Sequence, residues 1–312
     1  MGTIFRRELK GYFDSPMGFG IIGAFVVVIM LLSVLLDPAG SGGNWFERGE
    51  LSMRTFFGIF PWVAAVVVPA VSMRLWSEDR RQATFELLMT LPIPTWRIAL
   101  GKYFAGLVFL VCMLLATAAF PLMLMYFGSP DWGPVFGGYI ACFLLGAAFV
   151  AVGLFVSGLT ENQALSFFLA MLICLGIVGV GEMRGMLSEM ARENPQAAMI
   201  HLLSIPLVGL GILAAVVGRD KLLALIVVVV GFLMNTGVYL FTGGQDKAED
   251  SIRVASTGGE AMVQALAQVA VLEHFREIQR GVVNTNGLVF FVSLIVLFVF
   301  LNVWSLESRR YS

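Results

Sequence analysis

Long apolar stretches alternate with short polar ones along this chain of 312 residues. Eight of the apolar stretches reach, or nearly reach, the length that an α-helix needs to cross a bilayer core of roughly 30 Å. They cover residues 17–36, 56–73, 103–126, 135–157, 163–181, 202–217, 222–241 and 287–306. No charged residue lies inside any of them, so the pattern predicts an all-α, polytopic membrane protein.

The charges between the stretches predict the orientation. When the N-terminus is placed in the cytoplasm, Lys and Arg outnumber acidic residues in the inside segments, and acidic residues prevail outside. Cytoplasmic loops of membrane proteins carry such an excess of Lys and Arg. Both termini are therefore expected to face the cytoplasm.

The sixth and seventh stretches are expected to form a hairpin. Residues 202–217 would make a short helix that contains a proline, whereas residues 222–241 are rich in Leu, Ile, Val and Phe. Arg219, Asp220 and Lys221 lie between them, which puts the charged tip in the cytoplasm. Without this pair six spans remain, and the orientation of the last one is unchanged.

Composition excludes an ordinary soluble protein. Apolar residues make up 58% of the chain and charged residues 13%, whereas about a quarter of a soluble domain is charged. The net charge of −1 suggests no nucleic-acid partner. Cys112, Cys142 and Cys174 lie in apolar stretches without a CxxC spacing, so they are interpreted as packing residues.

The polar segment 74–102 separates the second stretch from the third. Within it, residues 84–90 (TFELLMT) predict a short amphipathic helix, with Phe85, Leu88 and Met89 on one face. Two prolines that follow shortly afterwards would end this helix, because proline lacks a backbone donor. One interpretation is a helix held just outside the bilayer; the alternative is a solvated loop whose charges only orient the protein.

Residues 1–16 predict another surface helix. Apolar and basic side chains alternate so that the apolar side would face the acyl chains and the basic side the lipid phosphates. A secretory signal or a generic anchor is the alternative, although the apolar run that follows is longer than a signal requires. The apolar side comprises Ile4, Phe5, Leu9, Tyr12 and Phe13.

A few residues inside the stretches predict how the helices pack. Gly138, Cys142 and Gly146 recur every four residues, which lets helices approach closely, either inside one subunit or between two. Asn235 and Asn302 are expected to form hydrogen bonds across helices. Kinks are predicted at Pro61, Pro69 and Pro121.

The outside segments predict surface helices. Residues 182–199 hold two glutamates four apart without a histidine at ligand spacing, which favours a helix face over a metal site. The large loop 243–286 has helical periodicity over residues 260–279, so a helix is expected on the outer surface. His274 and its neighbouring glutamates are a weaker candidate for a metal cluster.

Three kinds of active site are missing from the sequence. There is no G-x-x-x-x-G-K-[ST] phosphate loop, so ATP would have to be hydrolysed by another subunit. There is no H-E-x-x-H zinc motif. No ionisable acid or base lies within a stretch, whereas ion-coupled carriers generally need one. These absences favour an energy source outside the bilayer.

The polar segment resembles a known family. In order, it contains Met73-Arg74, Glu78, Arg81, Thr84, Glu86-Leu87-Leu88, Leu91-Pro92-Ile93 and Gly101-Lys102. This order resembles the first cytoplasmic loop of ABC-2 type permeases, and most closely the subgroup of gliding-motility-associated permeases and permeases of copper-enzyme maturation systems. The family usually has glycine where this chain has Ala83, which weakens the expectation of a tight turn there.

Other strings resemble the same subgroup. RRELKGYFDSP at residues 6–16 resembles its elbow helix, and GLTENQ at residues 158–163 resembles its second cytoplasmic loop. HFREIQRGVVNTNGLVFF, which begins at His274, resembles the segment that enters the last span. The resemblance covers most of residues 1–181 and 272–311.

The resemblance implies an ABC-2 (type V exporter-like) transmembrane domain with six core helices, into which the hairpin is inserted. Four parts are expected: residues 1–181 with the elbow helix, spans one to five and the coupling loop 74–102; residues 182–241 with an outside segment and the hairpin; residues 242–286 as an extracytoplasmic loop with an amphipathic helix; and residues 287–312 with the last span and a cytoplasmic tail.

The resemblance also implies a permease subunit of the bacterial cytoplasmic (inner) membrane. A separate ATP-binding cassette subunit would bind ATP-Mg, and this chain would bind no cofactor or metal and have no catalytic residue. Its other partners would be a second or related permease, membrane lipid and an extracytoplasmic protein. Contacts with the ATP-binding subunit are expected from Glu78, Arg81, Thr84, Glu86, Leu87, Leu88 and Glu161.

Two other classes of function remain open. The chain would be a transmitter if it passed ATP-driven motion to extracytoplasmic partners without moving a solute. It would be a membrane enzyme if polar residues such as Asn235, His274 or Glu277 supported a turnover. No residue pattern selects among lipid, polysaccharide, peptide and metal-related substrates.

Overall fold

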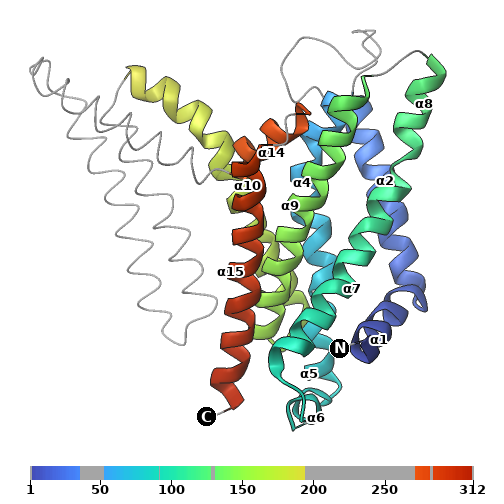
Figure 1. Ribbon diagram of the computed structural model, residues 1–312, viewed down its shortest axis with the longest axis vertical. Helices are drawn as coiled ribbons and strands as arrows, with labels where there is room; N and C mark the ends of the chain where they lie inside the picture. Colours follow the sequence, from blue (N-terminus) through green and yellow to red (C-terminus); the bar gives the residue numbers. More distant parts are fainter. Residues whose placement is uncertain are drawn as a thin grey trace, which may run out of the picture. The chain divides into compact units, whose positions relative to one another are not determined.

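The computed structural model describes residues 2–35, 53–90, 92–127, 131–193, 271–281 and 284–310. These residues form helices and short connections, with no strand among them (Figure 1). The helices are α1 (Gly2–Phe13), α2 (Pro16–Leu35), α4 (Arg54–Ser72), α5 (Arg74–Arg81), α6 (Phe85–Thr90), α7 (Thr95–Ala116), α8 (Ala119–Phe127), α9 (Trp132–Leu159), α10 (Gln163–Glu193), α14 (Val271–Gln279) and α15 (Thr285–Arg310). The prediction of an all-α protein is confirmed for this part of the chain.

Five helical segments are long and apolar enough to cross a membrane: Pro16–Leu35, Arg54–Arg81, Thr95–Tyr126, Trp132–Leu159 and Thr285–Glu307. They coincide with the first four stretches and the last stretch predicted from the sequence. The fifth predicted stretch corresponds to the start of α10, whose apolar part, Gln163–Gly179, is shorter. The predicted hairpin at residues 202–241 lies outside the described residues.

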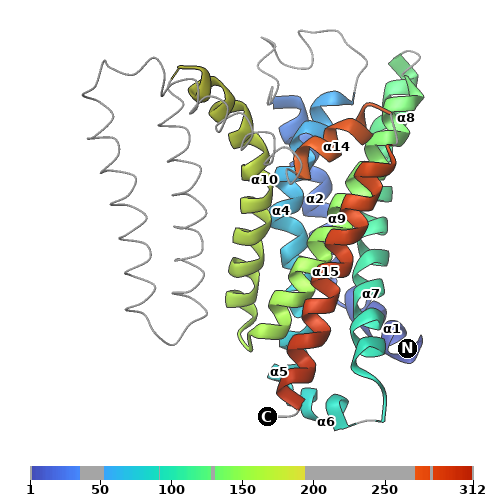
Figure 2. The ribbon, with the colours of Figure 1, turned by 60° about the vertical axis from the view of Figure 1, so that its left-hand side comes forward.

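The chain divides into two compact units, Met1–Val178 with Val271–Ser312, and Gly179–Ala270. Within the second unit, the structure describes only the last part of α10. In the first unit α9 is the central helix: most of its side chains after Ala141 are buried, and α4, α7, α14 and α15 pack around it (Figures 1 and 2).

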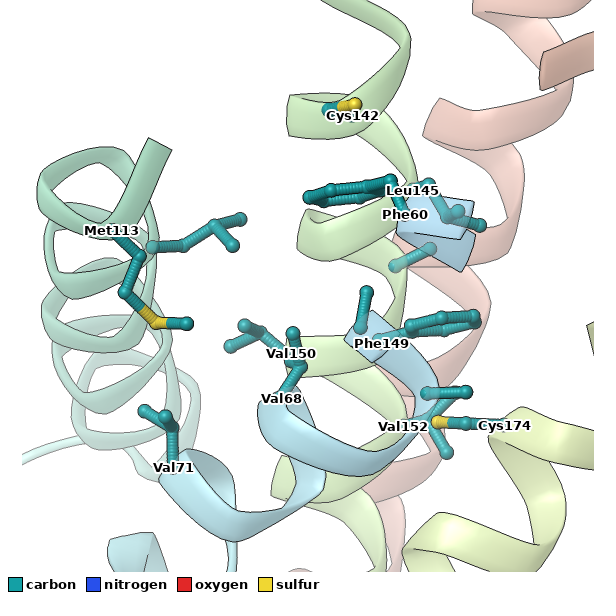
Figure 3. Close-up of a cluster of buried hydrophobic side chains, with 14 of the residues drawn as sticks. Phe60, Val68, Val71, Met113, Cys142, Leu145, Phe149, Val150, Val152 and Cys174 are labelled. Carbon is teal, nitrogen blue, oxygen red and sulfur yellow. The ribbon is translucent and has the colours of Figure 1, made fainter. Parts of the chain in front are cut away.

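The core of the first unit is filled by large apolar side chains. Figure 3 shows part of this core, which includes Phe60 of α4, Met113 of α7, and Leu145 and Phe149 of α9. Cys174 of α10 lies beside this cluster and is fully buried. An apolar helix that is buried on nearly all sides, as α9 is after Ala141, belongs at the centre of a bundle.

Small residues let α9 approach its neighbours closely. A Cβ atom added at Gly138 would lie 2.3 Å from the ring of Phe57 in α4, and one at Gly146 would lie 2.7 Å from Leu110 in α7. Cys142, between them, is fully buried. The four-residue repeat therefore packs helices inside the subunit, which confirms that interpretation over a seam between two subunits.

The third predicted span is broken into α7 and α8. Pro121 lacks a backbone N–H, and in a continuous helix its ring would clash with the carbonyl of Thr117. Residues 117 and 118 form a turn, and the Thr117 hydroxyl donates to the Leu114 carbonyl at 2.7 Å. The kink predicted at this proline is confirmed. Pro61 and Pro69, by contrast, lie inside α4.

The first helix packs on protein through residues that were expected to face lipid. The ring of Tyr12 stacks on Phe109 of α7, with centroids 4.8 Å apart, and its hydroxyl donates to the Val71 carbonyl at 3.0 Å. Ile4 is buried as well. The expectation of acyl-chain contact is therefore wrong for Ile4 and Tyr12, because neighbouring helices offer them an apolar surface.

The two ends of the first unit differ in character. α1, α5, α6 and the end of α15 lie at one end, and α8 and α14 lie at the other (Figures 1 and 2). The N-terminal helix and the end of α15 thus share one side with the polar segment 74–102.

Candidate functional site

The polar segment begins at a break between α4 and α5, at Met73. In an unbroken helix the amides of Trp76 and Ser77 would donate to carbonyls four residues earlier. Here both amides donate to the hydroxyl oxygen of Ser157 in α9, at 3.0 and 3.1 Å. The Ser157 hydroxyl in turn donates to the Met73 carbonyl at 2.9 Å. One inserted side chain therefore bends the helix where it leaves the apolar region.

α5 ends in a tight turn at Ala83. The amide of Thr84 donates to the Asp79 carbonyl at 2.9 Å, and that of Ala83 to the Arg80 carbonyl at 3.1 Å, which is the pattern of a Schellman cap. Ala83 has a φ of 54°, in the left-handed region that glycine usually occupies. The turn that the alanine made less certain from the sequence is present, at a conformational cost of about 1 kcal/mol.

α6 is held against α5 by its apolar face. The rings of Phe85 and Trp76 meet edge to face with centroids 5.9 Å apart, and the Arg80 guanidinium lies 4.4 Å from the Phe85 centroid. Leu88 is buried. The predicted face is therefore confirmed for Phe85 and Leu88, whereas the side chain of Met89 lies outside the described residues.

The opposite face of α6 is open to solvent. Glu86 is exposed, and Leu87 keeps 66% of its surface exposed. Arg81, at the end of α5, is exposed as well. The polar segment thus presents a carboxylate and an apolar side chain on α6, whose other face is fixed, and a guanidinium at the end of α5.

The remaining residues predicted on this segment make contacts within the chain. Leu88 is buried, as described above. The hydroxyl of Thr84 donates to the Asp79 carbonyl at 3.2 Å. Glu78 accepts a hydrogen bond from Gln82 at 2.7 Å. Of the six residues predicted on this segment, Arg81, Glu86 and Leu87 are the ones most open to a partner.

The connection between α9 and α10 adjoins the end of α5. Arg80 donates to the Gly158 carbonyl at 2.7 Å, and its Nη1 lies 3.9 Å from the carboxylate of Glu161. The side chain of Glu161 is 85% exposed. The structure therefore brings this predicted residue beside the polar segment, although the two are far apart in the sequence.

A buried lysine joins the polar segment to two other helices. Lys102 of α7 is 1% exposed, and its ammonium donates to Glu8 of α1 at 2.8 Å and pairs with Asp79 of α5 at 2.5 Å. It also donates to the Leu75 carbonyl at 2.5 Å and lies 4.9 Å from the ring centroid of Trp76. A buried ammonium requires such partners, because an unpaired buried charge is strongly destabilising.

Arg7 completes this group on the solvent side. Its guanidinium donates to Glu8 at 2.7 Å and to Asp79 at 3.0 Å, and the side chain is 49% exposed. Burial alone lowers the pKa of Arg7, but the bond to Glu8 and the charge of Asp79 outweigh it and raise the pKa. Arg7, Glu8, Asp79 and Lys102 form the ionic cluster, in which two positive charges balance two negative ones.

Most of the ionic cluster was not predicted from the sequence. Lys102 was expected in a polar loop before the third span, whereas α7 begins at Thr95 and carries Lys102 inward. The string Gly101-Lys102 marked this lysine as part of the family pattern but named no partner. Glu8 and Asp79 lie in separate surface helices, and no local periodicity pairs them.

Two other predicted sites lie away from the polar segment. The Asn302 amide of α15 donates to the Leu154 carbonyl of α9 at 3.0 Å, which confirms a bond across helices. Asn235 lies outside the described residues. His274 stacks on Phe290, with ring centroids 4.4 Å apart. Within the described ranges, no group of three or more His, Cys, Asp or Glu residues could hold a metal ion.

Five helical segments in the described part of the chain are long and apolar enough to cross a membrane, and a polar segment lies at one end of them. This architecture is that of a multi-pass membrane protein. The family described as ABC-2 family transporter protein matches residues 51–219, which is more than half of the chain and includes α4 to α10. The chain belongs to the ABC-2 transporter family. Its members are membrane transport subunits that are not themselves catalytic, and the family implies an ATP-binding cassette partner in general. No curated protein matches the chain.

Proposed function

We propose that this chain is the membrane-spanning subunit of an ABC transporter that exports or translocates a substrate, and that a separate ATP-binding subunit docks on α6. The closest functional type is the gliding-motility-associated and copper-enzyme-maturation subgroup, in the bacterial cytoplasmic membrane. ATP-Mg binds in the partner subunit. Two permeases, identical or related, form the pathway.

The exposed face of α6 is the observation that carries this proposal. Leu87 is an open apolar side chain flanked by charged Glu86, and an apolar centre with a polar rim suits a protein–protein interface. The opposite face is fixed by Phe85 and Leu88. A helix held in this way transmits a displacement instead of deforming.

A short route leads from α6 into the spans. Phe85 contacts Trp76 of α5, and the amide of Trp76 is bonded to Ser157 of the central helix α9. Arg80 reaches the end of the same helix through the Gly158 carbonyl. Movement of α6 would therefore reach α9, around which the other helices pack.

The direct test uses the double variant Glu86→Arg with Leu87→Asp. Both side chains are exposed, so the fold should be retained while the docking surface is reversed in charge and polarity. The chain is purified together with the ATP-binding subunit that serves as its partner. We expect the affinity for that subunit to fall at least about 30-fold, as for the loss of an interface hot spot.

Glu307→Arg is the matched control, because it reverses an exposed carboxylate at the same end of the first unit but on α15. This control should bind the ATP-binding subunit as the wild type does. If the double variant also binds the ATP-binding subunit normally, and the permease still stimulates the ATPase of that subunit, α6 is not the docking element.

A second candidate function is the transmission of ATP-driven motion to an extracytoplasmic partner. The packing of α14 favours it: this helix lies at the end opposite α6, and Phe275 stacks on Phe60 of α4 with centroids 6.5 Å apart (Figure 2). ATP-dependent movement of a solute in proteoliposomes that contain both subunits would contradict this candidate. Retained partner binding without such movement would favour it.

A further inference from the structure

The ionic cluster extends the polar segment to α1, a helix that the docking of α6 does not involve. Lys102 lies between Glu8 of α1 and Asp79 of α5, within hydrogen-bonding distance of both. We propose that Lys102 is a positioning residue that fixes α5 and α6 to α1, so that α1 moves with α6 as part of the coupling machinery. This inference rests on the proposed function.

Asp79 is the residue at which α6 and the ionic cluster meet. Its carbonyl accepts the Thr84 amide at 2.9 Å and the Thr84 hydroxyl at 3.2 Å, which closes the turn into α6. Its carboxylate binds Lys102 at 2.5 Å and Arg7 at 3.0 Å. A displacement of α6 that moves Thr84 therefore acts directly on cations of α7 and α1.

Lys102 is held too firmly for α1 and α5 to separate easily. Its side chain is 1% exposed, so water cannot readily replace a carboxylate that moves away. Loss of either Glu8 or Asp79 as a partner would leave a buried charge incompletely compensated. The two helices are therefore expected to tilt together.

The attachment of α1 at its other end suits such a tilt. The Tyr12 hydroxyl donates to the carbonyl of Val71, two residues before the break at Met73. α1 is thus anchored close to the point where α5 leaves α4, and its earlier residues Arg7 and Glu8 bind farther along α5 and on α7. α1 and α5 would therefore tilt about neighbouring points near Val71 and Met73, and the ionic cluster joins them at a distance from those points.

The functional experiment compares Asp79→Asn, Lys102→Met and the double variant, each in complex with the ATP-binding subunit. Because Glu86 and Leu87 are unchanged, the Kd for that subunit should stay within about 2-fold of the wild type. The stimulation of its ATPase by the permease should fall about 10-fold. Arg6→Gln, an exposed neighbour on α1, is the control that should retain full stimulation.

The double variant separates positioning from simple stability. Each single variant leaves the cluster with an unbalanced charge and should lower the midpoint of thermal unfolding, whereas the double variant restores neutrality and much of the stability. We expect ATPase stimulation to remain low in the double variant. If stability and stimulation recover together, the cluster only supports the fold and the inference is overturned.

A measurement on the permease alone keeps this inference apart from the docking proposal. Spin labels at Lys10→Cys on α1 and Thr90→Cys on α6, in a background with Cys112→Ser, report the distance between the two helices. The wild-type cluster should give one narrow distance, and Asp79→Asn with Lys102→Met a broad distribution. That change would support the linkage even if the α6 variants left docking intact. An unchanged distribution would overturn it.

Discussion

At the scale of single residues, the hydroxyl of Ser157 determines how α4 passes into α5. It accepts hydrogen bonds from two backbone amides and donates one to a carbonyl, so it replaces some of the backbone hydrogen bonds of a continuous helix. No sequence pattern identifies this serine, because it lies in α9, far along the chain from the helices it joins. The proline at position 69 was the visible candidate for the bend, and it lies inside α4.

Replacement of Ser157 by alanine should therefore destabilise the α4–α5 junction. The amides of Trp76 and Ser77 would lose a buried acceptor, at a cost of about 2–3 kcal/mol in the free energy of unfolding. Thermal unfolding in detergent and faster hydrogen exchange at the two amides would report it. Ser166→Ala is the control, since the buried hydroxyl of Ser166 has no hydrogen-bond partner within the described part of the chain. An equal loss in both variants would contradict this account.

Ala83 offers the opposite change, a stabilising one. Its φ of 54° is unfavourable for any residue with a Cβ atom, and glycine at this position would relieve about 1 kcal/mol. We expect Ala83→Gly to slow hydrogen exchange of the Ala83 and Thr84 amides, which close the turn. Faster exchange at these amides would mean that the turn is not under conformational strain.

At the scale of the helices, the apolar pattern predicted the spans and missed what happens at their ends. The positions of α2, α4, α9 and α15 follow from uninterrupted apolar length, since a bilayer imposes that length. α7 begins well before its apolar stretch because Lys102 finds charged partners inside the protein. A hydropathy pattern considers only neighbouring residues, so it cannot predict that a charged residue is buried when its partners lie in distant segments.

Close helix packing gives a prediction for α4 and α9. A Cβ atom at Gly153 would lie 1.7 Å from the Ser72 hydroxyl oxygen and 2.6 Å from the Ser72 Cβ, which cannot rotate away, so Gly153→Ala must push the two helices apart. We expect a loss of about 1–3 kcal/mol, measured by thermal unfolding in detergent. Gly23→Ala in α2, where nothing lies within 4 Å, should change stability by less than about 1 kcal/mol. Equal effects at both glycines would contradict the packing described.

At the scale of the whole molecule, the family and the multi-pass architecture were predictable, whereas the interior of the candidate site was predictable only in part. Arg81, Glu86 and Leu87 were among the residues named from the family string, but that string also named Leu88, which is buried. The ionic cluster did not follow from that string, because it joins α1, α5 and α7 through contacts between segments far apart in sequence. Which face of the membrane carries α6 remains a prediction from the distribution of Lys and Arg.

Chemical labelling of Leu87→Cys with a membrane-impermeant maleimide tests the central claim most directly. Leu87 is exposed on α6, so the thiol should react in inside-out vesicles and not in intact cells, and the bound ATP-binding subunit should protect it. Glu307→Cys, at the same end, should react from the same side without comparable protection. Reaction of residue 87 from outside the cell, or at the same rate with and without the ATP-binding subunit, would contradict the account.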